Sequence, residues 1–160
     1  MPSSRSARPL DAYDRAILRI LQRNNKTPQR TIADQVNLSA AAVQRRIAAM
    51  EAAGTITANV AVVDPHAVQP TITVVVEVNM HSDRSTVIDA TKALFRSTPE
   101  VQQCYFVTGG AGFILIVIVP DMAAYEALAR RLFADNEAVL RYRTLVVMDR
   151  VKTGLAIEIP

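Results

Sequence analysis

Cysteine is nearly absent from this 160-residue chain, tryptophan is absent, and long apolar runs are missing. The single cysteine, Cys104, cannot form an intramolecular disulfide, and with only two histidines in the chain no metal site is expected. The longest unbroken apolar run, Phe113 to Val119, spans seven residues, whereas a membrane-spanning helix needs about 20. Because the first residues contain no apolar stretch that would direct export, we expect a cytoplasmic protein without a membrane partner, metal or cofactor.

Charge is distributed unevenly along the chain. Half of the residues are hydrophobic and 21% are charged, which is typical of folded domains and excludes a disordered chain. Residues 1–60 contain nine Lys/Arg and four Asp/Glu, a net charge of +5, whereas residues 61–160 contain nine and eleven, a net charge of −2. The basic character of residues 1–60, beside the mildly acidic residues 61–160, indicates that the N-terminal region binds a polyanion.

Three helices with the spacing of a helix-turn-helix are expected before residue 55. Apolar residues recur at four-residue spacing over residues 13–21 and predict a first helix that ends before Pro28. A short helix fits residues 29–36. Ser39 is a favourable N-cap for a third, alanine-rich helix that continues to Ala53.

The third helix separates an apolar stripe from a face of small and polar residues. Val43, Ile47 and Met50 form the stripe, so Gln44 and Arg45 on the opposite face can enter a groove and read adenine or guanine edges. The competing interpretation is a solvated helix face. We predict that the DNA-contacting residues are Arg30, Thr31, Ser39, Ala41, Gln44, Arg45 and Ala48.

Other basic residues of this region have different expected roles. Arg46 falls on the flank of the apolar stripe, where we expect a structural ion pair with Asp14 or Glu51. Arg30 and Thr31 begin the second helix, where backbone amides favour a phosphate. Arg5 and Arg8 lie in a proline-bounded tail and are expected to add non-specific attraction to DNA.

The pattern becomes that of strands after residue 55. Residues 56–62 alternate between apolar and polar and predict a linking strand. The order that follows is strand, helix, strand, strand, helix, strand, at residues 72–80, 85–96, 101–107, 113–119, 122–133 and 142–151. That order predicts a ferredoxin-like βαββαβ domain, an antiparallel sheet with two helices on one face, and hence an α+β protein. Because two of the strands are apolar on both faces, the uncovered face is a predicted oligomer interface.

Short stretches between residues 10 and 152 carry a family resemblance. They are Leu10-Asp11, Asp14, Ile17-Leu18, Leu38-Ser39, Val43, Arg46-Ile47, Met50-Glu51, Gly54-Thr55-Ile56, Val107-Thr108-Gly109, Val119-Pro120-Asp121-Met122 and Val146-Val147-Met148. In these stretches the chain resembles the Lrp/AsnC family of bacterial transcription regulators. After a proline-bounded tail at 1–9, which is expected to be flexible, the resemblance implies a winged-type helix-turn-helix at 10–55, a linking strand and linker at 56–70, and a ferredoxin-like effector and assembly domain at 71–160. It also implies double-stranded DNA as partner, and homodimers that assemble into octamers.

The resemblance places an effector site in a loop at the contact between dimers. Its expected residues are Thr108, Gly109, Gly110, Ala111 and Gly112, together with Asp135 and Glu137. The family often carries acidic residues in this loop, whereas here it is rich in glycine, which offers only backbone groups to the ammonium of an amino acid. We therefore expect a weak or absent response to leucine. The alternative is a plain glycine-rich hairpin turn.

Two other functions remain open at this point. Haem-pathway decarboxylases share the two-domain arrangement by resemblance, but His66, His81 and Cys104 are scattered along the chain and indicate no catalytic cluster, so no catalytic residue is assigned. A stand-alone small-molecule-binding module, with a helix-turn-helix that no longer reads DNA, is the other alternative. Our preferred interpretation is that the protein is a sequence-specific DNA-binding transcription regulator. It is expected to be modulated by an effector and not to be an enzyme.

Overall fold

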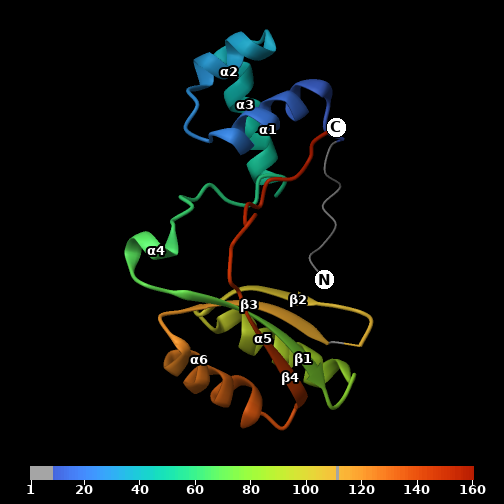
Figure 1. Cartoon of the computed structure of the whole chain (residues 1–160). Helices are drawn as coiled ribbons and strands as arrows, with labels where there is room; N and C mark the ends of the chain where they lie inside the picture. Colours follow the sequence, from blue (N-terminus) through green and yellow to red (C-terminus); the bar gives the residue numbers. More distant parts are fainter. Residues whose placement is uncertain (1–8, 111) are drawn as a thin grey trace. The chain divides into compact units, whose positions relative to one another are not determined.

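The computed structural model describes residues 9–110 and 112–160, which fall into two compact units. The first unit contains residues 9–62 together with Thr153–Pro160, and the second contains Val63–Lys152. Figure 1 shows the elements of both. Arg5 and Arg8 of the expected tail, and Ala111 of the expected effector loop, lie outside the described residues.

The first unit contains three helices, which are α1 (Ala12–Arg23), α2 (Gln29–Val36) and α3 (Ala40–Ala52). All three predicted helices are confirmed. Ser39 caps α3 as expected, because its Oγ accepts a hydrogen bond from the backbone N–H of Ala42 at 3.2 Å. The buried side chains of this unit form a single core, made of Ile17, Leu18, Ile32, Ala33, Val36, Val43 and Met50.

A tight turn joins α2 to α3. Asn37 adopts the left-handed conformation with φ of 54°, which asparagine tolerates better than most residues. The backbone N–H of Leu38 donates to the carbonyl of Ala33 at 3.1 Å and closes the end of α2. This turn fixes the crossing of the two helices and completes the predicted helix-turn-helix.

The linking strand expected at residues 56–62 is not formed, and neither is a wing. Among its described residues, the first unit has helices and extended chain but no strand. The side chains of Val60 and Val62 are 69% and 94% exposed. A strand needs a neighbour to pair its backbone groups, and no described segment pairs with this one, so correct alternation alone does not make it a strand. A short helix that the sequence did not indicate, α4 (Pro65–Val68), follows.

The second unit is the predicted ferredoxin-like domain. Its strands are β1 (Ile72–Met80), β2 (Val101–Phe106), β3 (Phe113–Val119) and β4 (Val139–Val146), and its helices are α5 (Ser85–Ser97) and α6 (Met122–Ala129). The sheet order is β2-β3-β1-β4, and all neighbouring strands are antiparallel. In the part of the chain that is described, no helix has both the length and the apolar character needed to cross a bilayer.

Two boundaries of this domain differ from the prediction. Strand β4 begins at Val139 rather than residue 142, because Val139 pairs with Met80 after a shift of register in β1. It ends at Val146, five residues before the predicted end, although the backbone N–H of Val147 still donates to the carbonyl of Thr73 at 2.9 Å. The last turn of the helix predicted over 122–133 is the π-helical segment η1 (Arg130–Ala134).

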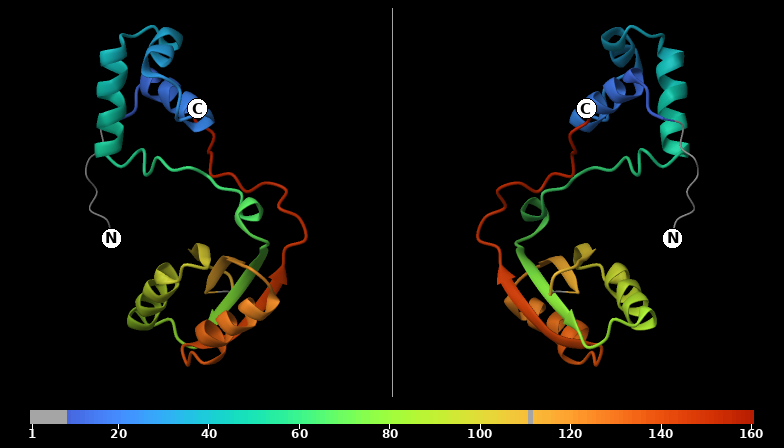
Figure 2. Two further views of the ribbon diagram at one scale, coloured as in Figure 1. Left: turned by 90° about the vertical axis from the view of Figure 1, so that its left-hand side faces the viewer. Right: turned by 90° about the vertical axis from the view of Figure 1, so that its right-hand side faces the viewer.

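The two faces of the sheet differ in their cover. Helices α5 and α6 cover one face (Figure 2), where alternate side chains of β1 and β3 are fully buried around Phe95. The opposite face carries Ile114, Ile116 and Ile118 of β3, which remain partly exposed. The described chain therefore leaves one sheet face without a covering layer. That face is apolar along β3, whereas Glu77 of β1 and Arg143 of β4 form an ion pair on it, with Oε2 and Nη1 3.6 Å apart.

The C-terminal residues 153–160 lie beside α1 (Figure 1), although they follow directly from the ferredoxin-like domain in sequence. The side chain of Gln22 accepts from the backbone N–H of Ile157 at 2.9 Å and donates to its carbonyl at 3.0 Å. The Nε of Arg19 donates to the carbonyl of Ile159 at 3.0 Å, and Ile159 packs against the helical core. We call residues 153–160 the C-terminal strap.

Replacing Gln22 with alanine is expected to loosen the C-terminal strap. The change removes both hydrogen bonds to Ile157 and should cost about 1 kcal/mol, because both are exposed to water. Hydrogen exchange of the Ile157 amide is the measurement, and it should become faster. The control is Gln29→Ala, since Gln29 is exposed and its side chain makes no hydrogen bond with any described residue. Equal exchange in both variants would show that Gln22 does not hold the strap.

Candidate nucleic-acid interface and ligand sites

The seven predicted DNA-contacting residues, from the start of α2 to the middle of α3, are all exposed. Ser39 also caps α3, so its hydroxyl is already engaged. Gln44 and Arg45 form no hydrogen bond or ion pair with any described residue, and their polar groups are available to a partner. Val43, on the inner side of the same helix, is fully buried. One face of α3 therefore packs against the core of the unit, and the opposite face is exposed to solvent.

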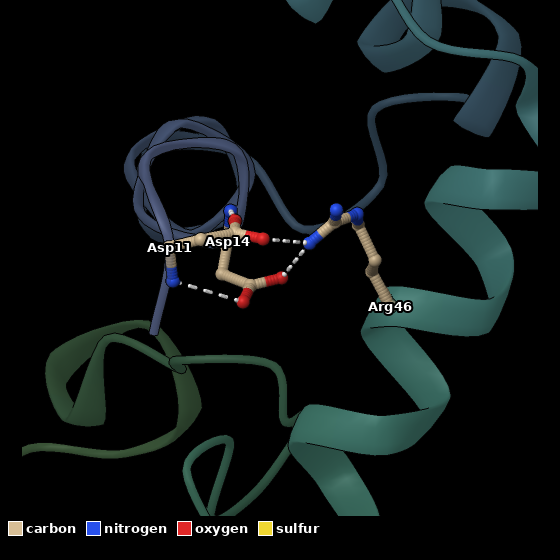
Figure 3. A network of polar contacts seen from close by, with 3 residues as sticks. All are labelled: Asp11, Asp14 and Arg46. Carbon is tan, nitrogen blue, oxygen red and sulfur yellow. Dashed lines mark hydrogen bonds and ion pairs between the residues drawn. The ribbon is translucent and has the colours of Figure 1, made fainter. Parts of the chain in front are cut away.

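Arg46 has the structural role that its position predicts. Its Nη1 donates to the Oδ2 of Asp11 and to the Oδ1 of Asp14, each at 2.7 Å (Figure 3). Of the two expected partners, Asp14 is confirmed, whereas Glu51 instead accepts a hydrogen bond from Asn59 at 2.7 Å. The Arg46 contacts join the first turn of α1 to the middle of α3.

The two aspartates also form the capping box of α1. The backbone N–H of Asp14 donates to the Oδ1 of Asp11 at 2.9 Å, and the N–H of Asp11 donates to the Oδ2 of Asp14 at 3.2 Å. The hydrogen bonds to Asp11 and then to Asp14 raise the pKa of the Arg46 guanidinium above its ordinary value. The guanidinium also lies 5.4 Å from the ring centroid of Tyr13. Arg46 therefore keeps its charge and stays on the inner side of α3.

The start of α2 is open to an anion. Pro28 occupies the N-cap position and forms no side-chain cap, and no side chain among the described residues accepts a hydrogen bond from the first amides of the helix. Arg30 and Thr31 follow in the first turn and are exposed. Free amides at a positive helix end, with a guanidinium beside them, suit a phosphate oxygen.

The glycine-rich loop between β2 and β3 is a tight turn. Gly109 and Gly110 have φ values of 95° and 101°, a conformation that residues with a side chain rarely adopt. At Gly112, an added Cβ would lie 2.9 Å from the Cγ of Met80. The Nδ2 of Asn79 donates to the carbonyl of Gly110, which ties the loop to β1. Backbone geometry thus accounts for the glycines in this turn, whether or not the loop also binds a ligand.

Asp135 and Glu137 lie near the C-terminal end of β1, as the glycine-rich loop does, but on the side of β4 rather than of β3. They belong to the segment before β4, where the N–H of His81 donates to the carbonyl of Ala138 at 2.9 Å. Since β1 lies between β3 and β4, the two loops flank it from opposite sides. No hydrogen bond or ion pair within residues 9–110 and 112–160 joins either carboxylate to the glycine-rich loop. Their meeting at a contact between dimers stays a prediction.

A cavity that the sequence analysis missed lies between α5 and β2 in the second unit. Its volume is about 390 Å³, and Arg96 and Cys104 are among the residues that line it. Cys104, which sits in a strand, is exposed. No three His, Cys, Asp or Glu residues gather as a metal site anywhere in the described part of the chain. Lys92 and Arg96 lie at four-residue spacing on α5, but this spacing alone does not indicate a cavity.

Comparison with known families matches both units. Residues 10–51 match the family described as the AsnC-type helix-turn-helix domain, and residues 73–157 match the Lrp/AsnC ligand binding domain. An uncharacterized HTH-type transcriptional regulator of Sinorhizobium fredii is 42% identical over 153 residues, which are 96% of this chain and 90% of that protein. The leucine-responsive regulatory protein of Salmonella typhimurium is 30% identical over 148 residues, which are 92% of this chain and 90% of that protein.

Solved structures show the same fold. An AsnC family transcriptional regulator from Agrobacterium tumefaciens has a TM-score of 0.85 at 32% identity, covering 93% of this chain and 97% of that chain. A transcriptional regulator of Neisseria meningitidis in complex with L-methionine has a TM-score of 0.83 at 24% identity, covering 94% and 97%. At that identity the second likeness supports the fold alone.

Proposed function

We propose, because the chain belongs to the Lrp/AsnC family of helix-turn-helix transcriptional regulators, that the exposed face of α3 reads the major groove of double-stranded DNA. The relatives are transcriptional regulators and not enzymes, so the decarboxylase alternative is wrong. A DNA partner also implies that the protein works in the compartment that holds the chromosome, which for a bacterium is the cytoplasm. Residues 10–55 and 71–160 would then act as the DNA-binding and the effector and assembly domains.

One observation carries the assignment of the reading face. Two neighbouring arginines of α3 differ completely in their contacts: Arg46 is held by two carboxylates, whereas Arg45 has no partner among the described residues. Bidentate contact of an arginine with guanine, or of a glutamine with adenine, is the commonest direct reading of a base edge. Ala41 and Ala48 are small and exposed beside Gln44, which lets the backbone approach the bases. Arg30 and Thr31 at the start of α2 supply the phosphate contact that sets the register.

Replacing Arg45 with alanine is expected to weaken operator binding by about 5- to 150-fold, the equivalent of one base contact worth about 1–3 kcal/mol. Binding to random DNA should change far less, because base contacts specify whereas phosphate contacts position. The operator is first located by footprinting the upstream region of the protein's own gene, and affinities are then measured by fluorescence anisotropy.

The matched control for this experiment is Arg23→Ala. Arg23 ends α1, is exposed and forms no hydrogen bond or ion pair with any described residue, so the variant loses the same charge outside the reading face. An equal loss for Arg45→Ala on operator and random DNA would show a phosphate contact instead. Absence of binding by the unaltered protein at low salt would overturn the proposed function and favour the stand-alone ligand-binding module.

The second unit is proposed to assemble the protein and to hold its effector. The uncovered sheet face supports assembly, because it exposes the apolar side chains of Ile114, Ile116 and Ile118 in a row along β3. A homodimer through this face, and an octamer built from dimers, is the arrangement we propose. Thr108 and Gly109 to Gly112, with Asp135 and Glu137 of a neighbouring chain, would border an effector such as an amino acid. Since the loop carries no carboxylate, leucine should act weakly or not at all.

A further inference from the structure

The cavity between α5 and β2 is lined by both aromatic and cationic side chains. Phe106, which lines the cavity, is 54% exposed, and its ring centroid lies 5.0 Å from that of the fully buried Phe113. Lys92 and Arg96, one helical turn apart on α5, line the same cavity. The volume of about 390 Å³ lies in the range of small-molecule sites. The cavity is therefore large enough for a compact organic molecule.

The charges around the cavity have one sign. No aspartate or glutamate is among the residues that line it. The carboxylate of Asp89 pairs with the Nζ of Lys92 at 3.5 Å, but Asp89 is 73% exposed and lies outside the lining. Arg96 forms no hydrogen bond or ion pair with any described residue. A guanidinium with free donors in a cavity that is also lined by aromatic rings suits a carboxylate better than any neutral group.

Cys104 lines the cavity and lies near Arg96. Burial raises the pKa of the Cys104 thiol, and the charge of Arg96 opposes this rise. The thiol is exposed, and it is close enough to Arg96 to sense its charge. Because Cys104 is the only cysteine of the chain, it reports on the cavity selectively.

We propose that this cavity binds a small carboxylic acid with an aromatic or branched apolar body and no α-ammonium group. The apolar body packs on Phe106, the exposed aromatic ring of the lining, while the carboxylate accepts hydrogen bonds from Arg96 and meets the charge of Lys92. An α-ammonium is excluded because it would meet two cations and no lining carboxylate. The site is separate from the expected effector residues in the glycine-rich loop, none of which lines the cavity.

Protection of Cys104 from alkylation by iodoacetamide tests the proposal in the full chain. Phenylacetate is the probe, and it should slow alkylation in a saturable way. Phenylacetamide has the same shape without the charge and should protect at about tenfold higher concentration, the equivalent of one charge-assisted hydrogen bond. Phenylalanine, which adds the ammonium group, and leucine should protect no better than phenylacetamide. None of these measurements involves DNA, so their failure is distinct from a failure of the proposed function.

Two variants distinguish binding in the cavity from a general effect of the protein's charge on alkylation. Arg96→Gln should raise the concentration of phenylacetate needed for half protection about tenfold. Because the charge of Arg96 lowers the pKa of Cys104, this variant should also change the alkylation rate without probe. Protection is therefore expressed, for each variant, as the ratio of the alkylation rates with and without phenylacetate. Arg130→Gln is the control, since Arg130 is exposed and does not line the cavity. No protection by phenylacetate, equal protection by phenylacetamide, or unchanged protection in Arg96→Gln would each overturn the proposal.

Discussion

Replacing Arg46 with methionine is expected to lower the free energy of unfolding of the helix-turn-helix unit by about 3 kcal/mol, near the low end for breaking a buried ion pair. The carboxylate of Asp14 is fully buried, and the change removes the guanidinium that donates to it at 2.7 Å. The same change removes the hydrogen bond to Asp11 and the bridge from α3 to the start of α1. Urea unfolding followed by circular dichroism gives the measurement.

The neighbouring arginine provides the control. Arg45→Met removes the same charge and adds the same side chain one position earlier, where the residue is exposed, so stability should change by less than about 0.5 kcal/mol. Combining Arg46→Met with Asp14→Asn should recover part of the loss, because the buried charge is removed together with its partner. Similar losses for both arginine variants would show that the ion pairs do not stabilise the fold.

Local patterns in the sequence were sufficient for the three helices of the first unit, since each is determined by residues close to one another. The stripe of Val43, Ile47 and Met50 set the orientation of α3, and it also placed Arg46 on the flank where it pairs. The run at 56–62 shows the limit of such reasoning. Alternation indicates that a segment can form a strand, but only a neighbouring strand satisfies its backbone groups.

Features that depend on distant residues were beyond the reach of the sequence. Gln22 and Ile157 are 135 positions apart, and nothing in either stretch indicates their pairing. The start of β4 depends on the shift of register at Met80, which is a property of two strands together. The cavity at Cys104 was missed for the same reason, because its walls come from a helix and a strand that each look ordinary alone.

The uncovered sheet face leads to the second large effect. Replacing Ile116 with glutamate is expected to weaken dimerisation more than about 100-fold, because burying a charge without a partner costs several kcal/mol. Ile116 lies at the centre of this face, where its register partners are Gln103 on β2 and Val75 on β1, and Val75 in turn pairs with Leu145 on β4. Light scattering across a dilution series measures the dissociation.

The control for Ile116→Glu places the same charge elsewhere in the second unit. Met122 begins α6 and is 43% exposed, and a glutamate there also favours the positive start of the helix, so Met122→Glu should leave assembly unchanged. Ile116 is partly exposed and lies outside the buried core, so we expect the Ile116→Glu variant to fold. Circular dichroism of both variants checks this expectation. A folded Ile116→Glu protein that dimerises as tightly as the control would place the interface on another surface. The exposed Val60 and Val62 are then the next candidates, because a second copy could supply the neighbour that residues 56–62 need to pair as a strand.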